Sequence, residues 1–129
     1  LQAAIGVAQL ERIENIHKNR RAYELQYRKI LSGKNFTFQK DLNGRQRITW
    51  LVSFLLDNNT NRDEYIKILK SHGIDARPSF YPLSSMPIYK KYSSQSTPIT
   101  HKISKSGLNL PTYESLKSFT EIGKIFSMV

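Results

Sequence analysis

Apolar residues recur at a spacing of three to four over the first 31 residues, which predicts one long helix. The apolar positions are Leu1, Ile5, Ala8, Ile13, Ile16, Tyr23, Tyr27 and Ile30. Charged residues fill the positions between them, and we expect that second face to be solvated; they are Glu11, Arg12, Glu14, Lys18, Arg20, Arg21, Glu24 and Arg28. Ser32-Gly33 supplies the end of the helix, with Lys29 in its last turn.

The first turns of this helix are rich in small residues, namely Ala3, Ala4, Gly6 and Ala8. A glycine inside a helix costs about 1 kcal/mol relative to alanine, and close approach of another element would offset that cost. The sequence leaves two partners open: the domain's own core, which is the ordinary outcome, or a domain or subunit outside the chain. Because the pattern is already helical at Leu1, without an initiator methionine or a capping residue, we expect the chain to be a piece of a longer polypeptide.

After Gly33 the pattern changes to alternating and continuous apolar runs, which favours strands. Phe36-Thr37-Phe38 predicts a short strand, and Asp41 to Gly44 a turn. The run from Ile48 to Leu56 predicts the strongest strand, apolar on both faces and therefore central in a sheet.

The second half of the chain mixes short helices and strands. Residues 61–72 predict a helix with acidic residues in its first turn and Gly73 after its end. Residues 74–81 predict an edge or irregular strand because Pro78 interrupts it. Residues 82–98 read as loop, 99–106 as a short helix and 108–111 as an extended piece, and a last helix starts at Ser115 or Thr120. The fold class is α+β: a small, mostly antiparallel sheet flanked by a long N-terminal helix and shorter helices.

Composition narrows the class further. The 129 residues suffice for one domain, and we expect a single domain over residues 1–129. The absence of cysteine excludes disulfides and thiolate chemistry. Apolar runs are too short for a bilayer span. His17, His72 and His101 are far apart in the sequence and form no metal-binding motif. The sequence also has no nucleophile elbow and no glycine-rich phosphate motif, so we expect no catalytic or metal-ligating residue within this chain.

One segment nevertheless has the chemistry of a binding site. Arg77 stands near the end of the irregular strand and is followed by Phe80, Tyr81 and a proline. Arginine can form paired hydrogen bonds with a phosphate or carboxylate, and flat aromatic rings can face a sugar or base. The alternative interpretation is an exposed arginine beside two core aromatics.

Four stretches of the chain resemble the C-terminal domain of DegT/StrS-type sugar aminotransferases, perosamine synthases in particular. They are Leu1 to Ile13, Lys70 to Pro78, Phe80 to Tyr89 and Gly107 to Tyr113, and together they span nearly the whole chain. These enzymes use pyridoxal phosphate as an electron sink to aminate keto-sugars carried on nucleotides. Many relatives have histidine where Ser84 stands, so a role of that imidazole does not transfer to this chain.

The resemblance implies a division of labour. The lysine that holds pyridoxal phosphate and most phosphate contacts would lie in a large N-terminal domain absent from this chain, so the chain alone would be inactive and bind no cofactor. The whole enzyme would be a cytoplasmic homodimer that takes its amino group from an amino acid, with glutamate as the expected donor. Arg77 would then face the substrate's pyrophosphate, while Phe80 and Tyr81 face its sugar.

The net charge of +10 keeps a second class of function open. Lysine and arginine are dispersed along the chain, which suits solubility or an anionic substrate better than a nucleic-acid footprint. Cations and aromatics interleave only at Tyr89-Lys90-Lys91-Tyr92. The alternative to the enzyme fragment is thus a stand-alone basic module for nucleic acid or another polyanion, and a third possibility is a regulatory domain without catalysis.

Overall fold

The protein is described by a computed structural model that covers residues 1–57, 61–93, 96–113 and 119–128. Its centre is a four-stranded antiparallel sheet in the order β1-β2-β4-β3. The strands are β1 (Phe36–Phe38), β2 (Val52–Leu56), β3 (Arg77–Pro78) and β4 (Gly107–Leu110). The α+β class with a small antiparallel sheet is confirmed, and so is the central place of the strongest predicted strand.

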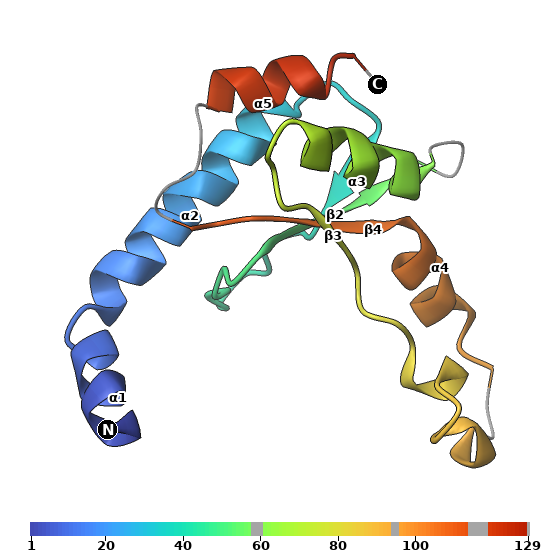
Figure 1. Ribbon diagram of the computed structural model, residues 1–129, viewed down its shortest axis with the longest axis horizontal. Helices are drawn as coiled ribbons and strands as arrows, with labels where there is room; N and C mark the ends of the chain where they lie inside the picture. The colour runs from blue at the N-terminus through green and yellow to red at the C-terminus, as the bar shows by residue number, and fades with distance from the viewer. Residues whose placement is uncertain (58–60, 94–95, 114–118, 129) are drawn as a thin grey trace.

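The described residues also form five α-helices and two short 3-10 helices, of which α1 and the two 3-10 helices lie away from the sheet (Figure 1). They are α1 (Gln2–Leu10), α2 (Ile13–Ile30), α3 (Arg62–Ser71), η1 (Leu83–Ser85), η2 (Lys90–Tyr92), α4 (Pro98–Ser106) and α5 (Phe119–Ile125). The helix predicted over residues 61–72 is confirmed: the Asn61 side chain accepts a hydrogen bond from the Asp63 backbone N–H, and Gly73 follows with a φ of 77°. The predicted start of the last helix at Ser115 lies outside the described residues.

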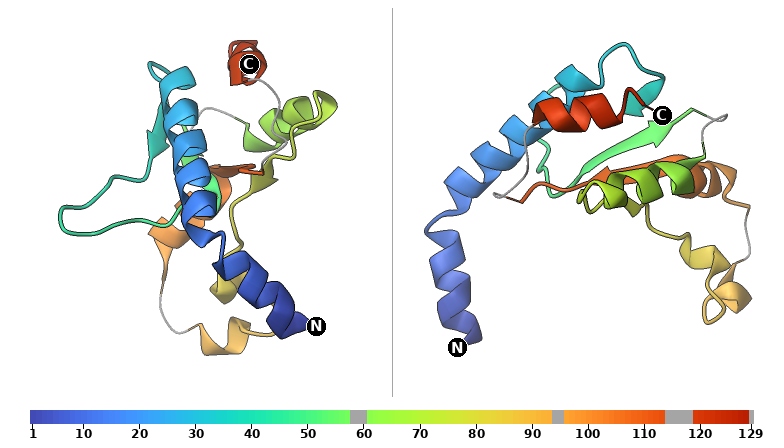
Figure 2. Two further views of the ribbon diagram at one scale, coloured as in Figure 1. Left: turned by 90° about the vertical axis from the view of Figure 1, so that its left-hand side faces the viewer. Right: turned by 45° about the horizontal axis from the view of Figure 1, so that its top comes forward.

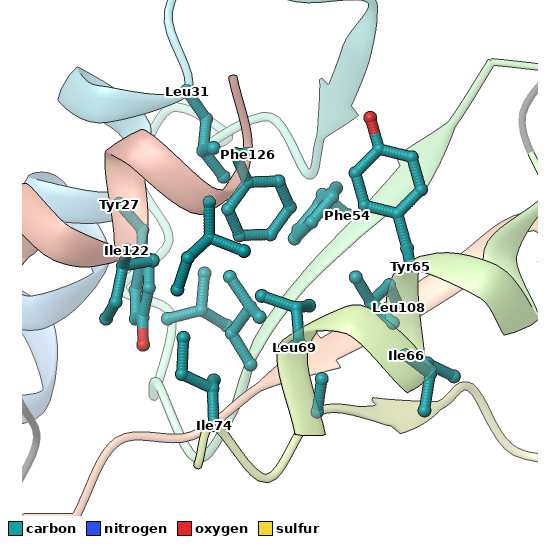
Figure 3. Packing of buried hydrophobic residues seen from close by; sticks show 14 of the residues in the cluster. Tyr27, Leu31, Phe54, Tyr65, Ile66, Leu69, Ile74, Leu108, Ile122 and Phe126 are labelled. Carbon is teal, nitrogen blue, oxygen red and sulfur yellow. The ribbon is translucent and has the colours of Figure 1, made fainter. Parts of the chain in front are cut away.

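The core lies where α2, α3 and α5 pack against the sheet (Figure 3). Aromatic rings from four elements meet there, since Phe126 contacts Phe36, Phe54 and Tyr65. The Tyr27 hydroxyl donates to the Pro111 carbonyl oxygen at 3.1 Å and so joins α2 to the end of β4. Every residue of β4 is buried, so the extended piece predicted over residues 108–111 is an inner strand of the sheet.

The prediction of one continuous N-terminal helix is wrong, because the helix breaks at Glu11 and Arg12. The Arg12 backbone N–H bonds back to the carbonyl of Gln9, three residues earlier, and this tighter turn ends α1. Core packing fixes the direction of α2 but reaches no residue of α1, which therefore diverges from the α2 axis (Figures 1 and 2).

Two further predictions need correction. The strand expected over residues 48–56 pairs with its neighbours only from Val52 onward. Before Val52, the Thr49 hydroxyl donates to Glu24 and the Trp50 carbonyl oxygen accepts from the Thr112 hydroxyl, so this segment is held by side chains instead of a neighbouring strand. Glu24, expected on the solvated face of α2, is only 2% exposed. The segment that holds Arg47 and Thr49 lies against Glu24 and bonds to its carboxylate, which accounts for the burial.

Candidate functional site

An open concavity of about 370 Å³ lies beside the ends of the inner strands. Arg77 lines it from β3, Phe80 from the segment after β3, and Trp50 from the segment before β2. Tyr113 lines it from the segment after β4, and Arg20 from α2. We call this hollow the sheet-end concavity. Four separate parts of the sequence meet in it.

The β3 side of the concavity is fixed by the neighbouring strand. Buried Asn109 on β4 lies opposite Arg77, donates to the Pro78 carbonyl oxygen at 3.2 Å, and accepts from the Ser53 hydroxyl at 2.6 Å. Gly107 lets the chain after Pro78 come close, since a Cβ there would lie 2.1 Å from the Ser79 Oγ. Arg77 and Phe80 are therefore held by the sheet.

The position of Trp50 depends on a buried ion cluster beneath it. Glu24 on α2 accepts hydrogen bonds from Arg28 at 2.9 Å and from Arg21 at 3.0 Å, and also from Arg47 and Thr49. Burial alone raises the pKa of Glu24, but the hydrogen bonds from Thr49, Arg28 and Arg47 outweigh burial and lower it. Because Thr49 directly precedes Trp50, this cluster ties the backbone that carries Trp50 to α2.

A second hydrogen bond holds the same segment from the other side. The Thr112 hydroxyl donates to the Trp50 carbonyl oxygen at 2.7 Å. The Trp50 indole then stacks on the Phe80 ring, with 6.3 Å between ring centroids and 19° between the ring planes. Both rings are largely exposed, and Phe80 retains 73% of its accessible surface. Exposed stacked rings form a platform that can bind a base or the apolar face of a sugar.

Arg77 already has an acidic partner in this structure. Its Nε and Nη2 both donate to Oδ2 of Asp75, at 3.0 and 2.7 Å. These hydrogen bonds lower the pKa of Asp75 and raise the pKa of Arg77. Both groups are exposed, so the pair orients the guanidinium more than it stabilises the fold.

The structure brings together two of the three residues predicted for substrate binding. Arg77 and Phe80 line the sheet-end concavity, whereas Tyr81 is 65% exposed and is not among the residues that line it. Sequence reasoning missed Trp50, Tyr113 and Arg20. The sequence did contain an indication for Arg20, because it is a charged residue on the apolar face of α2, where the spacing of three to four would place an apolar one. The apolar residues of that face are Ile13, Ile16, Tyr23, Tyr27 and Ile30.

Two parts of the chain extend away from this body on the same side (Figures 1 and 2). One is α1, and the other is the arm, residues 82–93 with η1 and η2. Both are apolar yet uncovered: Leu10 in α1 is 67% exposed, Ile88 and Tyr92 in the arm are similarly exposed, and no atom lies within 4 Å of a Cβ placed on Gly6. The small residues of α1 do not pack on the domain's own core, so that expectation is wrong.

A covalent site for pyridoxal phosphate needs a lysine amine inside a cavity. None of the described lysines lines the sheet-end concavity, although Lys18 and Lys124 line other hollows. Lys34, the one half-buried lysine among those described, donates to the Phe126 carbonyl oxygen. The sheet-end concavity therefore offers no lysine amine to that cofactor.

The fold is that of a domain of known aminotransferases. Over 98% of this chain, it superimposes on the aminotransferase TlmJ from Streptoalloteichus hindustanus with a TM-score of 0.82 and 20% sequence identity. It superimposes equally on S. venezuelae DesV in complex with a ketimine intermediate, with a TM-score of 0.85 and 20% identity over 98% of this chain. The matches cover 36% and 35% of those chains, so the chain has the fold of about a third of each.

The sequence agrees with the fold. Residues 1–127 match the DegT/DnrJ/EryC1/StrS aminotransferase family, and the chain belongs to that family. It is 37% identical over 119 residues to a GDP-perosamine synthase from Vibrio cholerae, covering 90% of this chain and 32% of that protein. It is 31% identical over 123 residues to a dTDP-4-amino-4,6-dideoxy-D-glucose transaminase from Escherichia coli, covering 90% and 33%. The chain thus spans about a third of the length of the curated relatives it matches.

Among the described residues, no helix is both long and apolar enough to cross a membrane.

Proposed function

We propose that residues 1–129 form the single C-terminal domain of a pyridoxal-phosphate-dependent aminotransferase that acts on a nucleotide-linked keto-sugar. The enzyme would replace the keto oxygen of the sugar with an amino group from glutamate, which leaves as 2-oxoglutarate. The observation that carries this proposal is the 37% identity to a GDP-perosamine synthase over 90% of the chain. The relatives' greater length leaves room for a cofactor-binding domain outside the chain.

The uncovered apolar surfaces support the same division of labour. Contiguous exposed apolar surface is typical of a surface that another domain covers. The exposed leucine, isoleucine and valine side chains of α1, with the apolar side chains of the arm, would lie against the cofactor domain. The body between these two projections would then form one wall of the substrate cleft in a cytoplasmic homodimer.

The sheet-end concavity supplies the substrate-binding groups of that wall. Arg77 would donate hydrogen bonds to the pyrophosphate through the guanidinium edge that Asp75 leaves open. Phe80 would hold the sugar or base on the platform that it shares with Trp50. Tyr81, exposed beside it in sequence, would reach the sugar from the rim of the cleft.

The proposal is tested with the full-length protein encoded by the gene. Purified protein is incubated with glutamate, pyridoxal phosphate and either a GDP-linked or a dTDP-linked 4-keto-6-deoxy sugar. We expect 2-oxoglutarate and amino sugar to form in equal amounts, and only when the keto-sugar is present. Residues 1–129 alone serve as the control and should form neither product. Absence of both products with full-length protein, cofactor and every keto-sugar would refute the proposed activity.

A further inference from the structure

The sheet-end concavity continues into a second hollow. This second concavity, of about 520 Å³, lies at the bend between α1 and α2 and is lined by Gln9, Asn19 and Tyr23 among others. Arg20, Thr112 and Tyr113 line both hollows. The two hollows are therefore neighbours with Arg20 at the junction, and together we call them the groove.

Arg20 differs from most arginines of the chain in having no acceptor. Five arginines pair with a carboxylate: Arg21, Arg28, Arg47, Arg62 and Arg77. Among the residues that the structure describes, Arg20 makes no ion pair and donates no side-chain hydrogen bond. Arg45 shares this property but is fully on the surface, whereas Arg20 is half-buried on the inward stripe of α2.

A half-buried guanidinium that lines an open hollow, with no acidic partner among the described residues, keeps its N–H donors available to an anionic ligand. Arg77 differs, because Asp75 already balances its charge. Three charged side chains line the sheet-end concavity: Arg20, Asp75 and Arg77. Since Asp75 and Arg77 balance each other, the excess positive charge is that of Arg20. A phosphate group matches the fork of N–H donors on a guanidinium in both charge and geometry.

We infer that Arg20 is a substrate-binding residue and that it holds the diphosphate of the nucleotide-sugar at the junction of the two hollows. This inference rests on the proposed function. The diphosphate would lie between the aromatic platform of Trp50 and Phe80 on one side and the hollow at the α1–α2 bend on the other. In the sheet-end concavity, Arg20 supplies the uncompensated charge and Arg77 adds donors of fixed direction; Arg12 lines the second hollow.

The experiment measures nucleotide binding by the full-length protein with isothermal titration calorimetry. The probes are GDP and dTDP, with guanosine and thymidine as the same bases without phosphate. The variants are Arg20→Gln, Arg20→Lys and Arg45→Gln, the last a matched arginine without an acidic partner outside the groove. We expect Arg20→Gln to raise the Kd of the diphosphate that wild type binds at least tenfold, because a charge-assisted hydrogen bond is lost.

The controls separate binding from structure. The Kd of the nucleoside should stay unchanged, Arg20→Lys should lose less than Arg20→Gln, and Arg45→Gln should behave as wild type. Should Arg20→Gln fail to fold, a smaller loss in Arg20→Lys that is confined to the diphosphate supports the same role for Arg20.

Two results would overturn the inference while leaving the proposed function intact. One is wild-type diphosphate affinity in Arg20→Gln. The other is an equal loss for nucleoside and diphosphate together with a lower Tm, as expected if Arg20 instead pairs with a carboxylate of the cofactor domain. A wild-type protein that binds neither diphosphate and transfers no amino group would refute the inference and the proposed function together.

Discussion

The body of this domain and its two projections share leucine, isoleucine and tyrosine side chains but place them in opposite environments. In the body, leucine, phenylalanine and tyrosine side chains from α2, α3, α5 and the sheet bury one another (Figure 3). In α1 and the arm, the same residue types face solvent, and α1 buries no residue at all. These residue types therefore form a core only where another apolar surface of the chain lies against them, as the sheet does against α2, α3 and α5. Under the proposed function, the cofactor domain would supply the apolar face that covers the projections.

The largest expected contrast comes from one substitution made in both regions. Leu108→Ala removes a fully buried side chain from β4 and should lower the free energy of unfolding by about 4 kcal/mol, through lost burial and the cavity left behind. Leu10→Ala in α1 should change it by less than about 0.5 kcal/mol in residues 1–129 alone. Urea denaturation of both variants measures the difference. Equal losses would show that α1 is part of the core.

The ion cluster allows a similar comparison between glutamates of α2. Glu24→Gln leaves Arg21, Arg28 and Arg47 without their shared carboxylate and should cost about 3 kcal/mol. Glu14→Gln, on the exposed face, should cost less than about 0.5 kcal/mol. Urea denaturation again gives both values, and acrylamide quenching of Trp50, the single tryptophan of the chain, should increase only in Glu24→Gln. Unchanged quenching would refute the role of the cluster in anchoring Trp50.

Two glycines sharpen the contrast on the backbone. A methyl group on Gly107 would collide with the Ser79 side chain and the Ile103 carbonyl, so Gly107→Ala should destabilise the body by about 2 kcal/mol. Gly6→Ala meets open space and should raise the helix content of α1 seen by circular dichroism, because alanine is the better helix former. In the full-length protein, Gly6→Ala should instead weaken the contact with the cofactor domain. If Gly6→Ala destabilised the body in residues 1–129 without the rest of the protein, the uncovered position of α1 would be contradicted.

The smallest effect is a dependence of stability on pH. The pKa of Glu24 is lower in the folded than in the unfolded chain, so its contribution is complete above the unfolded pKa and is lost as pH falls through the folded one. Stability should therefore fall between about pH 6 and pH 3 more steeply in wild type than in Glu24→Gln. Denaturation curves across this range check the slope, and identical slopes would mean that Glu24 is not held as a carboxylate.

Much of the body could be predicted from the sequence because its signals are local. The cap at Asn61, the stop at Gly73 and the strand around Phe54 depend on neighbouring residues, and all are present. The break after Leu10 could not be predicted, because no glycine or proline marks Glu11 and Arg12 as the end of a helix.

The candidate site was predictable only where it is contiguous in sequence. Arg77 and Phe80 are three residues apart, and an arginine close to an aromatic residue is typical of a site that binds a phosphate together with a sugar or base. Trp50, Tyr113 and Arg20 join them only through the strand order β1-β2-β4-β3 and the packing of α2. A pairing of segments that far apart leaves no local pattern, although a charged residue on an apolar stripe is a usable signal.

Amide hydrogen exchange of α1 tests most directly whether a domain outside the chain covers the projections. In residues 1–129 alone, the α1 amides should exchange with little protection while those of α2 and β4 stay protected. In the full-length protein, protection of α1 should rise toward that of α2, because its apolar face is then buried. Equally fast exchange of α1 in both proteins would contradict the presence of a covering domain.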